Sequence, residues 1–284
     1  MLGPRKITSF SLQDDLQLHV IPGFVDNYFY ILEQPSTSLC AVVDPGDAQP
    51  VLNFIADKRL ELTSLLLTHH HRDHVGGVPQ ILQKWPQATL VCSDWMKIPD
   101  SWIYQNHKIL RTNAETTEFI LNAPMRAIDV RGHTLDHIAF VFFDKVAPQR
   151  PVDVFVGDSL FGAGCGGLFE GTYAQLLTAL ANLRTLPGST RAWCAHEYTL
   201  KNLRVAIQLG EDNHAQAQRL STLESAIGEL KIDAHELMTI PLRLAEEIDT
   251  NPFLRWDQPT LQKAIDTTGP LETLTHVRTF RDRF

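Results

Sequence analysis

The chain has 284 residues, of which 44% are hydrophobic and 20% charged, an ordinary globular balance that allows one or two domains. Its formal net charge of −8 argues against nucleic acid as a partner, because binding to a polyanion usually requires a basic face. Apolar runs stay short of the ~20 residues of a membrane span, and residues 1–11 lack the apolar middle of a secretion signal. We therefore expect a cytoplasmic protein with no membrane partner.

Short apolar runs predict strands through the first two thirds of the chain. The run at residues 65–67 is continuous, as expected for a strand that is buried on both faces. Loops and helix candidates separate these runs, which indicates an α/β domain. The predicted strands cover residues 18–21, 39–43, 65–67, 88–92, 138–143 and 154–156.

Helices are predicted later in the chain. The clearest covers residues 173–186, where Leu176, Leu180 and Leu183 recur at helical spacing before a Pro-Gly stop. Residues 201–247 are rich in Ala, Leu, Glu, Gln and Arg, so we expect this segment to be helical. The sequence thus predicts an α/β domain followed by a smaller helical domain.

A histidine cluster follows the predicted strand that ends at Leu67. The segment Thr-His-His-His-Arg-Asp-His covers residues 68–74, and strand ends are where α/β folds usually bind ligands. His69 and His71 are alternate residues, so they can point to the same side of an extended segment. The Asp-His pair after them lies past a bend, which favours two neighbouring metal ions over one. Imidazole nitrogen and carboxylate oxygen are ligands of zinc, iron and manganese.

Three further ligand candidates follow at the ends of later apolar runs. His133 lies in Gly-His-Thr, Asp158 follows the run at residues 154–156, and His196 lies in Cys-Ala-His-Glu. Each alone is an ordinary loop residue. Together with the first cluster they supply five histidines and two aspartates. That set suffices for two metal ions, one bridging carboxylate and open positions for water.

The order of these elements resembles the metallo-β-lactamase superfamily. Its signature Thr-His-x-His-x-Asp-His is matched by residues 68–74, and Gly-His-Thr, Gly-Asp-Ser and His-Glu-Tyr follow in the same order. Further stretches resemble hydroxyacylglutathione hydrolases (glyoxalase II) more narrowly, and this resemblance covers nearly the whole chain. These stretches are residues 21–28, 164–172, 194–199, 251–255 and 277–284.

This resemblance implies a fold and an activity. The fold is a four-layer αββα metallo-β-lactamase sandwich at residues 1–197, followed by a small helical, glutathione-binding domain at residues 198–284. The implied enzyme is a thioester hydrolase that converts S-D-lactoylglutathione to D-lactate and glutathione in methylglyoxal detoxification. It carries two divalent metal ions per chain, for which we expect zinc, with iron or manganese as alternatives. We expect a monomer.

The resemblance also assigns roles to individual residues. Asp73 and Asp158 become the candidates that accept a proton from metal-bound water, and Asp158 bridges the two ions. Tyr198, Arg278 and Arg281 fall on glutathione-binding positions, where a guanidinium suits a carboxylate. The implied ligands are His69, His71 and His133 for one metal, and Asp73, His74 and His196 for the other.

Three positions depart from the family pattern. Gly167 stands where the family usually has Arg or Lys, which removes a cation from the expected glutathione site. Asp136 stands where the family usually has Gly, and it adds a carboxylate beside the metals. Phe169 stands where some members have Tyr. We therefore expect the metal set to be intact and the affinity for substrate to differ.

Three alternative functions stay open. One is a mono-iron persulfide dioxygenase of the same fold, and a count of two metals would argue against it. Another is a hydrolase of a different thioester. A non-catalytic metal-binding module is the third, and it would bind metal without turnover. Cys165 lies in a glycine-rich stretch, but the metals already supply a nucleophile, so we expect a free thiol there.

Overall fold

The computed structural model describes residues 2–99, 102, 109–112, 116–233 and 236–284. The chain forms two compact units. The sheet unit contains residues 6–129 and 136–157, and the helical unit contains the N-terminal residues to Arg5 together with residues 130–135 and 158–284. Among the described helices, none is both long and apolar enough to cross a membrane.

A seven-stranded sheet forms much of the sheet unit, in the strand order β2-β3-β4-β5-β6-β7-β8. Strands β2 to β5 pair antiparallel and β5 to β8 pair parallel. The four strands predicted in this part of the sequence are confirmed, one with the predicted boundaries (residues 39–43) and three with shifted ones. The strands are β2 (Thr8–Gln13), β3 (Leu16–Gly23), β4 (Asn27–Gln34), β5 (Leu39–Val43), β6 (Glu61–Leu66), β7 (Thr89–Ser93) and β8 (Ile109–Thr112).

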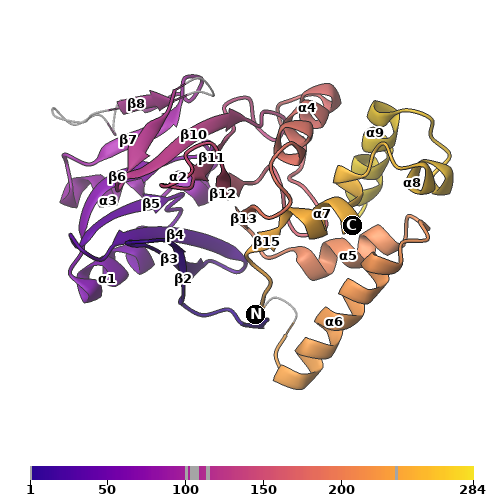
Figure 1. Cartoon of the computed structure of the whole chain (residues 1–284), viewed down its shortest axis with the longest axis horizontal. Helices are drawn as coiled ribbons and strands as arrows, with labels where there is room; N and C mark the ends of the chain where they lie inside the picture. Colours follow the sequence, from indigo (N-terminus) through magenta and orange to yellow (C-terminus); the bar gives the residue numbers. More distant parts are fainter. Residues whose placement is uncertain (1, 100–101, 103–108, 113–115, 234–235) are drawn as a thin grey trace. The chain divides into compact units, whose positions relative to one another are not determined.

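Both faces of the central strands β4 and β5 are buried. On one face, Phe29 and Ile31 of β4 share a core with Val51 of α1 and Ile81 of α3. Figure 1 shows these two helices beside the strands. Helical crossovers link β5 to β6 and β6 to β7, and the parallel pairing of these buried strands explains why their sequences read as apolar runs. The helices are α1 (Ala48–Lys58), α2 (Arg72–Val75) and α3 (Val78–Lys84).

The other face of the sheet packs on four antiparallel strands of the same unit. The ring of Tyr30 on β4 lies 5.3 Å from that of Phe155 on β12, centroid to centroid. The strands predicted at residues 138–143 and 154–156 are confirmed here. The four strands are β9 (Glu118–Ile120), β10 (Ala123–Asp129), β11 (Ile138–Phe143) and β12 (Pro151–Gly157).

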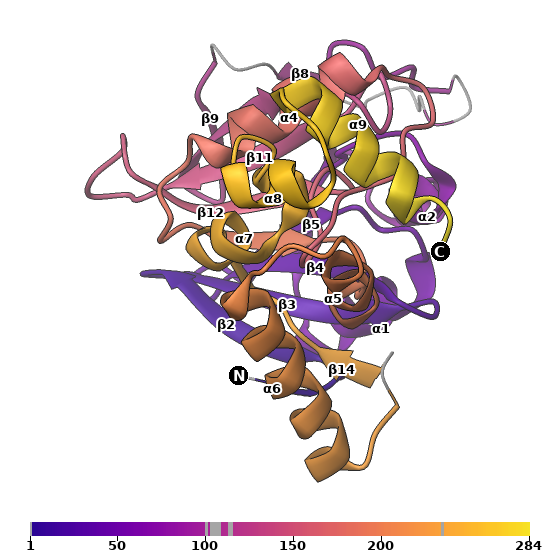
Figure 2. The ribbon, with the colours of Figure 1, turned by 90° about the vertical axis from the view of Figure 1, so that its right-hand side faces the viewer.

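The helical unit is built mainly from six helices. Its longest, α6, is prominent in Figure 2, where α9 runs beside α4. The predicted helix at residues 173–186 is confirmed as α4, which begins at a capping box between Thr172 and Gln175. The helices are α4 (Tyr173–Arg184), α5 (Thr199–Ile207), α6 (His214–Leu230), α7 (Leu244–Thr250), α8 (Pro259–Ala264) and α9 (Pro270–Arg281), with a 3₁₀ turn at Pro252–Leu254.

Short strands interrupt one segment that we expected to be helical. Within residues 201–247, α5 and α6 confirm the expectation, but β14 (Leu237–Met238) and β15 (Leu242–Arg243) contradict it. Strand β14 pairs with β1 (Gly3–Pro4), and β15 pairs with β13 (Arg191–Cys194). Pairing with distant strands overrides local helix propensity at these residues.

Candidate metal centre

The histidine cluster leads from β6 into the short helix α2. His69 and His74 are buried, with 0% and 1% of their surface exposed. The ring centroid of His69 lies 4.7 Å from that of His71 and 4.0 Å from that of His74. The extended segment and the helical turn after it therefore bring three imidazoles together.

Asp44, which sequence analysis did not identify, holds this cluster. It is buried at the end of β5, and its carboxylate accepts hydrogen bonds from the backbone N–H (2.8 Å) and hydroxyl (2.6 Å) of Thr68. The same carboxylate lies 3.0 Å from Nδ1 of His74. A carboxylate accepts, so Nδ1 carries the proton and Nε2 offers its lone pair to a metal. Asp44 follows an apolar strand, the signal that also identified Asp158.

Asp73 is held by two neighbours, one at the start of β4 and one in the turn after β5. The side-chain amide of Asn27 donates to Oδ2 of Asp73 at 3.1 Å. Gly46 approaches the backbone of Asp73 so closely that an added Cβ would lie 1.8 Å from its carbonyl oxygen. Only glycine fits this position. The Asp-Pro-Gly turn after β5 thus sets where Asp73 points, and Oδ2 of Asp73 lies 3.6 Å from Nε2 of His74.

In the helical unit, Asp158 lies between two histidines. Its Oδ2 is 3.4 Å from Nε2 of His133, and its Oδ1 is 3.5 Å from Nε2 of His196. Nδ1 of His133 lies 2.7 Å from the carbonyl oxygen of Gly167. Because a carbonyl can only accept, Nδ1 of His133 is protonated and Nε2 is again the available ligand.

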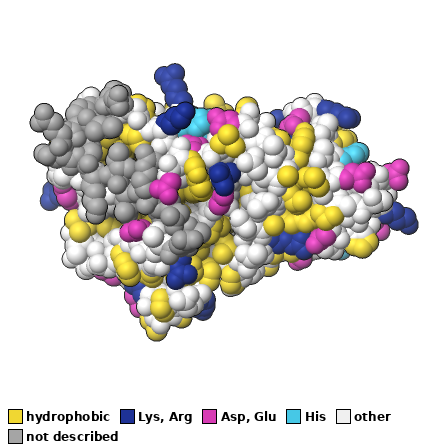
Figure 3. Space-filling model, turned by 90° about the horizontal axis from the view of Figure 1, so that it is seen from above, with side chains coloured by type: hydrophobic (Ala, Val, Ile, Leu, Met, Phe, Trp, Pro, Cys, Tyr) yellow, Lys and Arg dark blue, Asp and Glu magenta, His cyan; other side chains and the backbone are white. Residues whose placement is uncertain are grey.

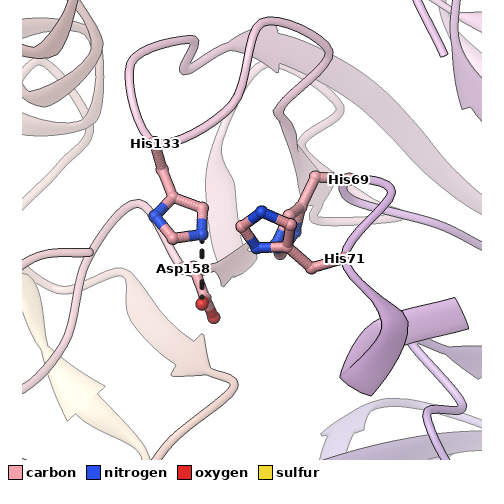
Figure 4. A group of neighbouring side chains, drawn as sticks. All are labelled: His69, His71, His133 and Asp158. Carbon is pink, nitrogen blue, oxygen red and sulfur yellow. Dashed lines mark ion pairs between the residues drawn. The ribbon is translucent and has the colours of Figure 1, made fainter. Parts of the chain in front are cut away.

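The separations between donor atoms fit shared metal ions. At 3.4 to 3.6 Å they exceed ordinary hydrogen bonds. Two ligands on one tetrahedral ion, with bonds of about 2.0–2.1 Å, lie about 3.3–3.4 Å apart. Figure 4 draws His69, His71, His133 and Asp158, with a dashed line at the ion pair between His133 and Asp158. The candidate ligands form two groups, and within each group the ligand atoms lie within 4.8 Å of one another. The first group is His69, His71, His133 and Asp158, and the second is Asp73, His74 and His196.

The cysteine in the glycine-rich stretch is not a reactive thiol. Cys165 is buried, and this burial raises the pKa of its thiol to about 11, although the charge of Arg278 opposes the shift. At neutral pH about one molecule in ten thousand then carries a thiolate, the form that acts as a nucleophile. The site therefore offers metal ligands and carboxylates rather than a cysteine nucleophile.

The residues on expected glutathione positions differ in their environment. Tyr198 is half-buried, and its ring stacks on His196 at 5.0 Å. Arg281 is half-buried, and its Nε donates to Oδ1 of Asn202 at 3.0 Å. Burial, followed by the neighbouring charge of Arg278, lowers the pKa of Arg281. Arg278 is buried, with 4% of its surface exposed.

The three departures from the family pattern also have defined places. Gly167 is half-buried beside Phe169, whose side chain is 72% exposed and whose ring lies 5.2 Å from that of His133. Asp136 is buried, and its Oδ1 lies 3.0 Å from Nδ1 of His70. The additional carboxylate of Asp136 is thus engaged by a histidine for which the sequence predicted no ligand role.

The fold and the site define the class of the protein. The metallo-β-lactamase superfamily model matches residues 22–196. A solved metallo-β-lactamase from Staphylococcus aureus covers 94% of this chain and 71% of its own, with a TM-score of 0.60 and 17% identity, a likeness of fold alone. The chain is a hydrolase of this superfamily, and the predicted α/β metallo-β-lactamase fold with a helical C-terminal region is confirmed.

The particular family follows from the rest of the chain. The model "Hydroxyacylglutathione hydrolase C-terminus" matches residues 197–284. A Nostoc protein named hydroxyacylglutathione hydrolase is 38% identical over 95% of this chain and 100% of its own length, and a Synechococcus protein of the same name is 41% identical over the same shares. The chain belongs to the hydroxyacylglutathione hydrolase family, and the dioxygenase and binding-module alternatives are not favoured.

Proposed function

We propose that this protein hydrolyses S-D-lactoylglutathione, and similar 2-hydroxyacylglutathiones, to the hydroxy acid and glutathione in methylglyoxal detoxification. The observation that carries the proposal is the donor set, because five histidines and two aspartates form two groups of ligand atoms. The full-length likeness to proteins named hydroxyacylglutathione hydrolase supports the substrate class. The cytoplasmic location expected from the sequence stays a prediction.

We propose two divalent cations as the cofactors. Zinc is the proposed metal because imidazole and carboxylate are its ordinary ligands, and iron and manganese accept the same donors. When bound, such ions lower the pKa of a shared water and stabilise the oxyanion that forms on a carbonyl. The carboxylate of Asp158, with one oxygen near each of two histidines, suits a bridging position.

We assign the transfer of the water proton to side chains of the protein. Hydrolysis forms a bond between the water oxygen and the carbonyl carbon and breaks the carbon–sulfur bond. The water proton must be accepted, and we assign this to the carboxylate of Asp73 or Asp158. The leaving thiolate has a conjugate acid with a pKa of about 8.5 if it resembles free cysteine, so no dedicated general acid is required.

For glutathione we propose contacts from Tyr198, Arg281 and the backbone at Gly167. Burial and, after it, the like charge of Arg278 lower the pKa of Arg281, and an anion bound there would relieve the repulsion between the two guanidinium groups. A glutathione carboxylate is such an anion. We propose the domain division at residues 1–197 and 198–284, which the meeting of the two family models at residues 196 and 197 supports.

We propose a monomer without a nucleic-acid partner. On the face drawn in Figure 3, Lys and Arg side chains are interspersed with Asp and Glu rather than gathered into a basic stripe. The net charge of −8 agrees with this distribution. Measurement of the mass in solution tests the oligomeric state.

Purified protein tests the activity directly. We expect release of D-lactate and free thiol from S-D-lactoylglutathione, loss of activity after metal removal, and two metal ions per chain by elemental analysis. Full activity in metal-free protein would contradict the proposal. One iron per chain and no hydrolysis would instead favour the dioxygenase alternative.

A further inference from the structure

The guanidinium of Arg278 contacts the glycine-rich loop rather than solvent. Its Nη1 donates to the carbonyl oxygens of Cys165 at 3.0 Å and Gly166 at 3.4 Å, and lies 3.7 Å from the sulfur of Cys165. Its Nη2 pairs with Oδ1 of Asp282 at 2.6 Å, and the group lies 5.1 Å from the ring centre of Phe253. With a side chain 5% exposed, Arg278 presents little surface to a glutathione carboxylate.

The same loop contacts two proposed metal ligands through its backbone. The N–H of Gly166 donates to the carbonyl oxygen of Asp158 at 2.9 Å, and the carbonyl oxygen of Gly167 accepts from Nδ1 of His133 at 2.7 Å. A Cβ on Gly166 would lie 2.2 Å from the Asp158 carbonyl oxygen and 2.7 Å from Nδ1 of His133. The loop therefore fits tightly against both residues, and a shift of its backbone would move them.

We propose that Arg278 is a positioning residue, which orients His133 and Asp158 for metal binding by holding the loop at residues 165–167. The inference rests on the proposed function, because it takes these two residues as ligands. It assigns to Arg278 a role that differs from the direct glutathione contact expected from the sequence. Its guanidinium contacts two loop carbonyls, an acidic partner and an aromatic ring, while its buried Nε has no hydrogen-bond partner among the described residues.

Other side chains of the helical unit contact the residues just before this loop. The side-chain amide of Asn251 donates to the carbonyl oxygens of Phe161 at 3.2 Å and Gly164 at 3.0 Å. The carboxylate of Glu247 accepts from the N–H of Ala163 at 2.8 Å. These side-chain contacts end at residue 164, and Arg278 contacts the next two carbonyls, those of Cys165 and Gly166.

Metal affinity, measured on metal-free protein by competition with a chelator, tests the proposal without any substrate. We expect Arg278→Gln to weaken zinc binding by about 10- to 100-fold, the usual effect of removing a group that orients a ligand. Arg278→Lys keeps a cation that can reach one carbonyl, so its loss should be smaller. Asp282→Asn changes a half-exposed partner and should weaken binding in the same direction, which keeps the test usable if Arg278→Gln fails to fold.

Arg281→Gln is the matched control, because it removes the same group three residues further along α9. We expect its zinc affinity to equal that of the wild type and its KM for the thioester to rise. Arg278→Gln should instead lower kcat at subsaturating zinc and recover when zinc is raised. If Arg278→Gln or Asp282→Asn binds zinc as tightly as the wild type and only KM rises, Arg278 is a substrate contact and the proposal is wrong.

The two proposals fail in different ways. A wild-type protein that binds two zinc ions but hydrolyses no glutathione thioester overturns the proposed function, whereas the zinc affinities of the variants still decide the role of Arg278. A wild-type protein that binds no zinc, iron or manganese overturns both proposals. Circular dichroism of each variant shows whether its fold is retained.

Discussion

At the scale of single residues, the site depends on which nitrogen of each histidine carries its proton. The carboxylate of Asp44 and the carbonyl of Gly167 accept from Nδ1 of His74 and His133 respectively. Both rings therefore present Nε2 as a ligand. The sequence predicts that these residues are ligands by type and spacing, but it contains no direct signal for the tautomer, because the acceptors lie on other loops.

Gly167 offers a test of the missing cation. We expect Gly167→Arg to lower KM for S-D-lactoylglutathione and to leave kcat nearly unchanged, because the added charge would aid binding alone. A Cβ at this position would lie 3.2 Å from the ring of Phe169, and that ring is largely exposed and can move. Steady-state kinetics measure the effect, with Gly167→Gln as an uncharged control. A large change in kcat would refute this division of roles.

His19 links stability to pH. It is buried, Oγ of Ser9 lies 2.6 Å from its Nδ1, and Oε2 of Glu33 lies 2.6 Å from its Nε2. Burial lowers the pKa of His19 below its ordinary value of 6.5, the bond to Glu33 opposes this, and the charge of Lys58 adds to it. Below pH 6.5 the unfolded chain therefore binds this proton more readily than the folded chain.

The stabilisation from neutral His19 is thus complete above pH 6.5 and is lost as the pH falls toward the lowered folded value. We expect the difference in free energy of unfolding between the wild type and His19→Gln to shrink from about pH 8 to about pH 5, the range of histidine titration. Urea unfolding measures it. The exposed His276→Gln serves as the control, and a difference that grows on acidification would contradict the prediction.

At the scale of elements, strand ends and helix starts place the proposed ligands. Asp158 and His196 each follow a strand, and Asp73 and His74 lie in the helical turn after β6. Apolar runs identify the strands in the sequence because burial on both faces demands them. The short strands β14 and β15 escape such prediction, because their partners β1 and β13 supply the hydrogen bonds.

The start of α4 depends on its capping box. Thr172 accepts from the backbone N–H of Gln175, and the side chain of Gln175 accepts from the backbone N–H of Thr172. We expect Thr172→Ala to lower the free energy of unfolding by about 1 kcal/mol, because an N–H at the helix start loses its acceptor. Thr178→Ala, the same change inside α4, should be neutral or slightly stabilising. Equal effects in urea unfolding would contradict this.

At the scale of the whole molecule, the proposed ligands are spread from His69 to His196. Bound ions would stabilise the folded chain alone, because the unfolded chain does not gather these ligands. We expect the free energy of unfolding to rise by about 2.7 kcal/mol when free zinc reaches 100 times its dissociation constant. Urea unfolding with and without zinc measures the increment. His74→Gln should reduce it and the exposed His276→Gln should keep it, and equal curves with and without zinc would contradict a bound ion.

The sequence by itself determined six of the strands, the residue types that can bind metal and the family resemblance. These features depend on local pattern: apolar runs report burial, and the spacing of His and Asp reports a shared site. Because these patterns are local, the sequence predicted the fold and the set of candidate metal ligands. The substrate contact expected at Arg278 stays a prediction from the resemblance, which transfers a position but not its surroundings.

Only the tertiary structure decided which side chains and carbonyls form hydrogen bonds with the proposed metal ligands and with the loop beside them. Arg278 and Cys165 are 113 residues apart in the sequence, and Asp44 and His74 are 30 apart. A local sequence pattern therefore does not predict their hydrogen bonds. Burial also depends on tertiary packing. An arginine on the surface can bind an anion from solvent, whereas a buried arginine donates its hydrogen bonds to acceptors within the fold. The role of a polar side chain is therefore set by the acceptors that the fold brings to it.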